Sequence, residues 1–237
     1  MIINCAAYTA VDRAESQPEM AEAVNVTAVK ALAIAAKQHG ARMIQISTDF
    51  VFGAGNGVPW TPSDLTDPQS VYGRTKRDGE RAVLDVLGSD ALVIRTAWLY
   101  SAHGGNFVKT MLRLMAERDE VRVIADQIGT PTWAHSLACT IWAAVDRPNV
   151  SGILHWTDAG VASWYDFAVA IQEEGVARGL LTRRVPVLAI PTTDYPTPAT
   201  RPSYSVLDKK DTVTLLGITP AHWRVNVRHM LDELLNV

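Results

Sequence analysis

Cysteine is scarce in this sequence, which contains only Cys5 and Cys139 among its 237 residues. These two residues have no metal-ligand spacing and give no disulfide framework. Each lies in an apolar segment, so we expect two buried, reduced thiols, as in a protein of a reducing cytoplasm. The histidines show no convergent spacing with carboxylates, and we assign no metal ligands.

Long apolar runs and an excess of positive charge are also missing. The most apolar helical stretch, Ala28–Ala36, is far shorter than the roughly 20 residues that span a bilayer. The first residues lack the basic flank and apolar core of a secretory signal, so we expect a cytoplasmic protein without membrane partners. A formal net charge of −3 argues against a general nucleic-acid binder.

Short apolar strands alternate with helices over the first 145 residues. The pattern predicts strands at Met1–Ala7, Ala41–Ser47 and Ala91–Thr96, and helices at Pro18–His39 and Gln69–Leu87. This alternation predicts an α/β fold, with a parallel sheet covered by helices on both faces. Ligands of such sheets bind beyond the carboxyl ends of the strands.

The rhythm changes from about Asn149 onward. Ser163 with Asp166 three residues later predicts a capping box that opens a helix over Trp164–Arg178. Thr219 and Pro220 predict a helix start, and the pattern predicts a final helix over Val225–Leu235.

Tyr72 and Lys76 form the most informative pair in the chain. Their four-residue spacing places both side chains on one face of the predicted helix. A free phenol has a pKa near 10, and a nearby ammonium favours its ionised form. Thr48, at the end of the preceding strand, adds a hydroxyl that can hydrogen-bond a carbonyl oxygen.

Several ordered segments carry a resemblance that covers essentially the whole chain. They are Asn4–Asp12, Ser47–Phe52, Tyr72–Lys76, Arg95–Tyr100, Asp126–Thr132 and Arg201–Pro202. In these segments the chain resembles the extended short-chain dehydrogenase/reductase family and, within it, the dTDP-4-dehydrorhamnose reductases. The resemblance implies a Rossmann-like, doubly wound parallel sheet that lacks its first βα units, with a smaller C-terminal α/β region.

The same resemblance implies a division of the chain. Residues 1–148 are expected to form a partial dinucleotide-binding domain that carries Thr48, Tyr72 and Lys76. Residues 149–237 are expected to form the substrate-binding region, interleaved with the first part.

The glycine-rich turn that opens a Rossmann domain and holds the pyrophosphate is absent. The glycine-dense stretch Gly53–Gly57 runs into Pro59 rather than into a helix, and we expect a plain loop. The family places the strand around Met1 after earlier βα units, so we expect an N-terminally truncated chain. A fragment, a misassigned start and half of a split protein stay open as explanations. The preference for NADPH or NADH, and activity of the chain alone, are not readable from the sequence.

The resemblance implies hydride transfer from NADPH or NADH to the 4-keto group of dTDP-4-dehydro-L-rhamnose, which gives dTDP-L-rhamnose for cell-envelope polysaccharide. In this scheme Tyr72 donates the proton, and Thr48 binds the carbonyl oxygen. Lys76 holds the ribose hydroxyls and lowers the pKa of Tyr72. Relatives often carry Tyr where this chain has Phe50, which removes one hydroxyl from the sugar site. Some relatives use a divalent ion such as Mg²⁺ at a subunit contact, as in a homodimer, and the sequence gives no means to place it.

Further residues are assigned to ligands by the same resemblance. Those expected at the cofactor, beside Tyr72 and Lys76, are Ala6, Ala7, Asn25 and Ser47. Those expected at the nucleotide sugar are Thr9, Val11, Trp98, Asn106, Gln127 and Arg201, with Arg201 suited to pair the pyrophosphate. Other interpretations stay open: tight packing at the alanines, a surface polar role for Asn25, a core position for Trp98, a helix cap for Asn106 and a solvated side chain for Arg201.

Two other functions compete with the reductase. One is a non-catalytic protein that resembles the regulatory subunit of methionine adenosyltransferase and tolerates loss of the glycine-rich turn. The joint presence of Thr48, Tyr72 and Lys76 speaks against it. The other is a sugar-nucleotide epimerase or dehydratase, for which the segments Arg95–Tyr100 and Asp126–Thr132 match less well.

Overall fold

The computed structural model describes residues 1–55 and 57–236. The chain divides into two compact units. The first comprises Met1–Thr96, Thr140–Trp156 and Thr197–Ile218, and the second comprises Ala97–Cys139, Thr157–Pro196 and Thr219–Val237. No helix in the described part is both long and apolar enough to cross a membrane. The predicted division at residue 148 into functional parts stays a prediction.

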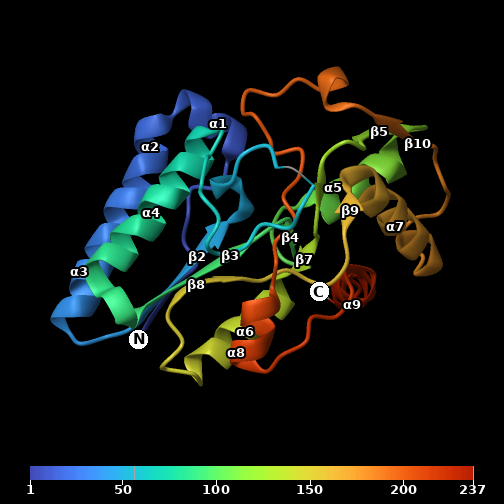
Figure 1. Ribbon diagram of the computed structural model, residues 1–237. Coiled ribbons are helices and arrows are strands. Elements are labelled where there is room, and N and C mark those ends of the chain that lie inside the picture. The colour runs from blue at the N-terminus through green and yellow to red at the C-terminus, as the bar shows by residue number, and fades with distance from the viewer. Residues whose placement is uncertain (56, 237) are drawn as a thin grey trace. The chain divides into compact units, whose positions relative to one another are not determined.

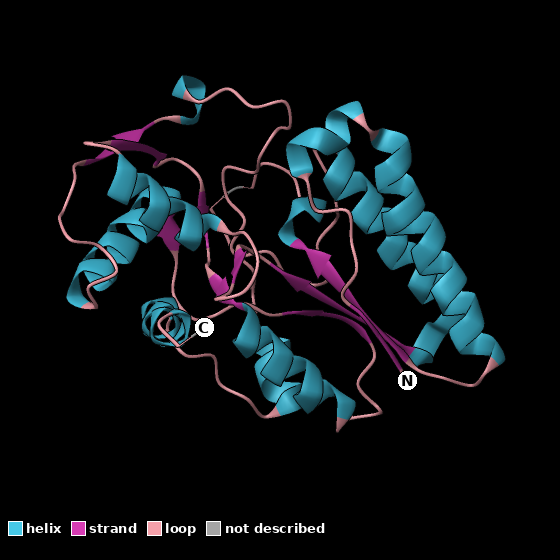
Figure 2. Ribbon diagram, turned by 180° about the vertical axis from the view of Figure 1, so that it is seen from behind, coloured by secondary structure: helices cyan, strands magenta, loops and turns pink. Residues whose placement is uncertain are grey.

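A four-stranded parallel sheet forms the centre of the first unit (Figure 2). Its strands, in spatial order, are β1 (Ile2–Asn4), β2 (Met43–Thr48), β3 (Ala91–Thr96) and β8 (Gly152–His155). Side chains of β2 and β3 are almost all buried, as expected of a parallel sheet with covered faces. The register pairs Thr48 with Thr96, so the carboxyl ends of these strands meet at one edge.

Helices cover both faces of this sheet, which confirms the predicted fold class. In Figure 1, α2, α3 and α4 lie side by side on one face, and α8 lies on the other. The helical elements of the first unit are α1 (Val11–Ser16), α2 (Pro18–Glu22), the π-helical turn η1 (Ala23–Thr27), α3 (Ala28–Gln38), the 3₁₀ turn η2 (Asp49–Val51), α4 (Val71–Leu87), the 3₁₀ turn η3 (Gly88–Asp90) and α8 (Lys210–Leu216). Helix α6 (Ala134–Val145) contributes its C-terminal half.

The close approach of α4 to η1 depends on a glycine. A Cβ atom built on Gly79 would lie 2.2 Å from the backbone oxygen of Asn25. Val29 and Ala33 of α3 pack with Val83 of α4 in a fully buried apolar cluster. The predicted helix over Pro18–His39 is therefore present, with one π-helical turn in its course.

Helices and short strand pairs build the second unit around a core of its own. The strands pair as β4 (Leu99–Tyr100) with β7 (Thr132–Trp133), β5 (Val121–Ile124) with β10 (Val187–Ile190), and β6 (Ile128–Gly129) with β9 (Ala162–Ser163). The helices are α5 (Phe107–Glu117), α7 (Trp164–Ala177) and α9 (Trp223–Leu234), with the 3₁₀ turn η4 (Thr192–Asp194). Phe167, Met115 and Met230 are among its fully buried side chains.

Several local predictions have clear outcomes. The capping box of Ser163 and Asp166 is present at the start of α7. The helix start predicted at Thr219 and Pro220 is wrong, because α9 begins at Trp223 with the His222 side chain as its cap. The final helix predicted over Val225–Leu235 is confirmed by α9. The loop predicted over 53–57 contains neither helix nor strand at its described positions, and Asn56 lies outside the described residues.

Candidate functional site

Thr48 and Tyr72 come together at the carboxyl edge of the sheet in the first unit. Thr48 is the last residue of β2, and Tyr72 lies in the first turn of α4, which Ser70 caps by accepting a hydrogen bond from the Gly73 amide. The Thr48 side chain lies close enough to Tyr72 to lower the pKa of the Tyr72 hydroxyl through hydrogen bonding. The backbone of Gly73 lies so close to η2 that a Cβ atom there would be 2.2 Å from the Phe50 carbonyl oxygen. The structure thus brings together the two hydroxyls that the sequence singled out.

The Tyr72 hydroxyl lies in a buried environment, which sets its pKa. Burial raises the pKa of Tyr72 to about 12, the hydrogen bond with Thr48 opposes this rise, and the Asp49 carboxylate adds to it. The pKa of Tyr72 is therefore raised rather than lowered as expected, because desolvation of the phenolate outweighs the opposing influences. The contribution assigned to Lys76 stays a prediction. Tyr72 is a protonated phenol at neutral pH, which is the form that donates a proton.

Lys76 lies one helical turn after Tyr72, as the spacing predicts, and is almost fully buried. Its Nζ atom donates a hydrogen bond of 2.7 Å to the backbone oxygen of Ile46 in β2. Burial lowers the pKa of Lys76 to about 8, while Glu80 and Cys5 act in the opposite direction. Its side chain therefore lies against the sheet at the same edge as Thr48.

Asp49 is a buried carboxyl group that the sequence reasoning did not assign to the site. Its Oδ1 atom accepts a hydrogen bond of 2.9 Å from Thr48 Oγ1, and its side chain also bonds to Ser205. Burial raises the pKa of Asp49 to about 6, against the opposing hydrogen bonds. The signal available in the sequence was its position directly after Thr48, at the end of a predicted strand.

Asn25 holds the segment after β1 against α4. Its Oδ1 accepts a hydrogen bond of 2.9 Å from the Tyr8 amide, and its Nδ2 donates to the Tyr8 carbonyl and to Thr75 Oγ1 at 3.2 and 3.1 Å. The side chain is buried, so the surface role left open for it does not apply. The π-helical turn, a feature often found at functional sites, places Asn25 between Tyr8 and the helix that carries Tyr72 and Lys76.

The other residues predicted at the cofactor lie at the carboxyl ends of β1 and β2. Ala6 is exposed and Ala7 is half-buried, so tight packing does not account for Ala6. Ser47 is buried, and its hydroxyl has no hydrogen-bond partner within the described residues. The unpartnered hydroxyl of Ser47 and the Lys76 ammonium, which bonds to the neighbouring Ile46, fit a polar, anionic nucleotide at this end of β2.

The cysteine prediction is wrong in one respect. Cys5 and Cys139 are free thiols, but both are exposed rather than buried. Cys5 follows the edge strand β1 directly, where no further strand of the described residues covers it. Cys139 lies on the outer side of α6, with its Sγ 3.7 Å from His135 Nδ1.

Three residues predicted at the substrate belong to the first unit. Thr9 is exposed, and Val11 is a half-buried residue that packs on the apolar cluster containing Tyr72. Arg201 is not a solvated side chain: its guanidinium donates to Asp12 Oδ1 and Oδ2 at 3.0 and 2.7 Å and to Thr197 Oγ1 at 2.6 Å. The hydrogen bond with Arg201 is the main cause that lowers the pKa of Asp12.

The remaining substrate predictions, Trp98, Asn106 and Gln127, fall in the second unit. Asn106 caps α5, because its Oδ1 accepts from the Lys109 amide at 3.3 Å, while its Nδ2 donates to the Ser101 carbonyl at 2.6 Å. Gln127 is buried and donates to Thr192 Oγ1 at 3.1 Å. Trp98 is half-buried and stacks on Trp164.

The family described as "RmlD substrate binding domain" matches residues 1–236. The chain belongs to this family. Among its relatives, the dTDP-4-dehydrorhamnose reductase of Escherichia coli strain K12 is 44% identical over 238 residues, which cover 99% of this chain and 79% of the relative.

Solved structures agree with this membership. A dTDP-4-dehydrorhamnose reductase from Clostridium acetobutylicum superposes with a TM-score of 0.91 at 41% identity, covering 99% of this chain and 81% of that one. The Bacillus anthracis dTDP-4-dehydrorhamnose reductase in complex with NADP gives 0.90 at 33% identity, with 98% and 80% covered. A dTDP-glucose 4,6-dehydratase from Streptomyces venezuelae gives 0.81 at only 16% identity, with 99% and 72% covered, and so shares the fold alone.

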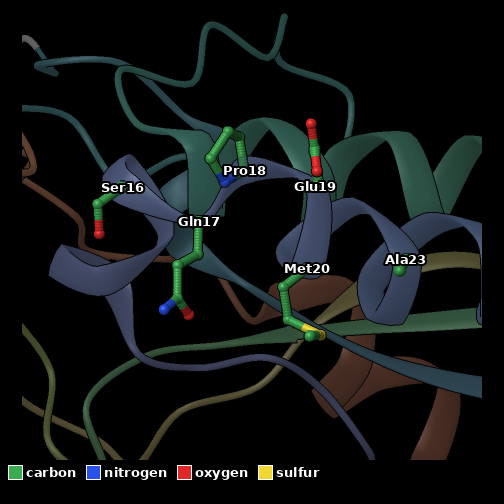
Figure 3. A pocket seen from close by; sticks show the side chains of 6 residues that line it. All are labelled: Ser16, Gln17, Pro18, Glu19, Met20 and Ala23. Atoms are coloured by element: carbon green, nitrogen blue, oxygen red, sulfur yellow. The ribbon is translucent and has the colours of Figure 1, made fainter.

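A separate surface pocket of about 560 Å³ is lined by residues at the junction of α1 and α2 and the start of η1 (Figure 3). Its walls are Ser16, Gln17, Pro18, Glu19, Met20 and Ala23. All of these residues are exposed, and none belongs to the predicted site of this RmlD-family chain.

Proposed function

We propose that this chain is a reductase that transfers hydride from a nicotinamide cofactor to the 4-keto group of dTDP-4-dehydro-L-rhamnose, which yields dTDP-L-rhamnose. The observation that carries this proposal is that Thr48, at the end of β2, and Tyr72, in the first turn of α4, come together, with Lys76 one turn further along α4. The 44% identity to a dTDP-4-dehydrorhamnose reductase over nearly the whole chain supports the choice of substrate.

In this reaction the side chains of the site supply the proton and hold the ketone in position. The nicotinamide supplies the hydride when it is bound. Tyr72, a neutral phenol, donates its proton to the oxygen that becomes the alcohol. Thr48, whose single hydroxyl proton bonds to Asp49 in the structure, turns that proton to the same oxygen and so orients the ketone toward the phenol. Lys76 stabilises the phenolate that Tyr72 leaves behind, because an ammonium in a buried site interacts strongly with a nearby anion.

We propose that the cofactor lies at the carboxyl ends of β1 and β2. We assign Ala6 and Ala7 to the backbone surface on which the dinucleotide lies, and Ser47 to a hydrogen bond with its nicotinamide side. Lys76 binds the ribose hydroxyls, and Asn25 fixes the segment after β1 that borders this surface.

Substrate contacts are proposed at Thr9, Val11, Trp98, Asn106, Gln127 and Arg201. Arg201 makes a bidentate pair with Asp12, and we propose that the substrate pyrophosphate competes with this carboxylate for the guanidinium. NADPH and NADH both remain candidates, and Mg²⁺ at a homodimer contact stays a prediction without assigned residues.

Turnover of the authentic substrate tests the proposal. Purified protein is mixed with dTDP-4-dehydro-L-rhamnose and either NADPH or NADH, cofactor oxidation is followed by absorbance, and the product is identified by mass spectrometry. The expected result is dTDP-L-rhamnose in amounts equal to the cofactor oxidised. Cofactor binding without product formation would contradict the proposal and would favour a non-catalytic protein of the same fold.

A further inference from the structure

Trp98 has an unusual backbone conformation. Its φ angle is +50°, and it is the one non-glycine residue in the described part of the chain with a positive φ. A bulky side chain in the left-handed region is a genuine outlier, since its Cβ crowds the neighbouring carbonyl. Such strain persists only where the surrounding structure holds the residue in place, and it gathers at functional sites.

Two sets of contacts in the second unit hold Trp98. The Thr132 amide donates a hydrogen bond of 3.1 Å to the Trp98 carbonyl, next to the pairing of Leu99 with Thr132. The indole ring of Trp98 stacks on that of Trp164, with 3.6 Å between ring centroids and 7° between planes. The side chain and the backbone of Trp98 are therefore fixed by different partners.

Trp164 is itself firmly placed. It is the first residue of α7, directly after Ser163, whose hydroxyl and amide both bond to Asp166 in the capping box. The Phe107 ring packs against Trp164 with centroids 4.6 Å apart, and the Phe167 ring lies 6.3 Å away. Trp164 is thus a rigid support, held by a helix cap and by the aromatic core.

The stack leaves Trp98 one-sided. Trp164 covers one face of the Trp98 indole, and Trp98 is only half-buried, so accessible surface of this residue remains outside the stack. A flat indole face suits the C–H groups on one side of a sugar ring. We infer that Trp164 is a positioning residue, which fixes Trp98 as a one-sided platform for the deoxyhexose ring of the nucleotide sugar. This inference rests on the proposed function, in which Trp98 contacts the sugar.

Substitutions at position 164 test the inference. W164L removes the stacking ring, W164F keeps a smaller one, and W142L serves as control, since Trp142 is 64% exposed on α6. Binding of dTDP-L-rhamnose, of dTDP and of NADPH is measured by calorimetry, together with KM for each substrate. Because dTDP lacks the sugar, it reports nucleotide contacts alone.

We expect W164L to weaken dTDP-L-rhamnose binding by about 5–10-fold, the size of an aromatic pair interaction. Binding of dTDP and NADPH stays unchanged, W164F gives an intermediate loss, and W142L behaves like the wild type. An equal loss for dTDP and dTDP-L-rhamnose, or no loss in a folded W164L protein, would overturn the inference. If W164L does not fold, W164F decides by the same comparison.

The readouts separate this inference from the proposed function. A wild-type protein that binds dTDP-L-rhamnose but fails to reduce the ketone contradicts the proposed function alone, and the binding comparison still tests Trp164. A wild-type protein that binds dTDP and dTDP-L-rhamnose equally well overturns the platform, because the sugar then adds nothing.

Discussion

Arg95 places its guanidinium on both carboxylate oxygens of Glu80. Arg95 Nε lies 2.9 Å from Glu80 Oε1, and a terminal nitrogen lies 2.7 Å from Oε2, with each side chain only 3% exposed. The guanidinium also lies 5.0 Å above the centre of the Phe52 ring. Glu80 stands one helical turn after Lys76 on α4, and its carboxylate acts to raise the pKa of the buried lysine.

The first prediction concerns Arg95→Met. The substitution leaves the Glu80 carboxylate buried without its partner, and we expect the free energy of unfolding to fall by about 3–5 kcal/mol. Chemical denaturation measures this change. Arg113→Met is the matched control, because the Arg113–Glu117 pair is 60% and 56% exposed and should contribute less than about 1 kcal/mol. Equal effects of the two substitutions would contradict the structural role of the buried pair.

The second prediction concerns pH and Asp49. The pKa of this carboxyl is about 6 in the folded protein and 3.8 in the free side chain, so the folded state holds the proton more tightly. The unfolding free energy contributed by Asp49 therefore falls as pH rises from about 4 to about 6, by about 3 kcal/mol at most. Above that window the contribution is flat.

Asp49→Asn removes this dependence. The free energy of unfolding of D49N minus that of the wild type should be larger at pH 7 than at pH 4. Denaturation of both proteins at both pH values measures this difference. Asp85→Asn, at an exposed position, should leave the pH dependence unchanged. A wild-type slope retained in D49N would show that other groups are responsible.

The third prediction concerns Gly79. An added methyl group would meet the Asn25 backbone oxygen at 2.2 Å, so Gly79→Ala must push α4 away from η1. We expect a loss of about 1–3 kcal/mol in unfolding free energy, with weaker cofactor binding, because Lys76 lies on the same helix. Gly105→Ala is the control, since no atom lies within 4 Å of its built Cβ. A stable G79A protein with unaltered cofactor binding would contradict the close packing described here.

Local patterns predicted much of the fold, because they depend on residues near in sequence. The four-residue spacing of Tyr72 and Lys76 correctly placed them one turn apart, and Ser163 with Asp166 correctly marked the start of α7. The helix Lys210–Leu216 was missed: it is short, and its preceding residue provides no side-chain cap.

Other features depend on residues far apart in the chain, which periodicity does not reveal. The stack of Trp98 on Trp164 joins segments that share no sequence pattern. Tryptophan normally avoids a positive φ, so the sequence does not indicate the φ that Trp98 adopts. Likewise, the burial of Asp49 and the raised pKa of Tyr72 follow from what surrounds them in space. Candidate residues such as Thr48 and Tyr72 could be proposed from the sequence, but the pKa values that their surroundings produce could not.

The fourth prediction carries the central claim, that Tyr72 is the proton donor. Tyr72→Phe keeps the ring that packs at 5.5 Å from Phe50 and removes only the hydroxyl, so the fold and ligand binding should persist. Tyr195→Phe, at a position 57% exposed, is the matched control.

Turnover of dTDP-4-dehydro-L-rhamnose by the wild type, Y72F and Y195F is the measurement that tests this claim most directly. We predict that kcat of Y72F falls on the order of 10²–10⁴-fold with little change in cofactor binding, while Y195F matches the wild type. Turnover by Y72F near that of the wild type would contradict the assignment of Tyr72 as the acid.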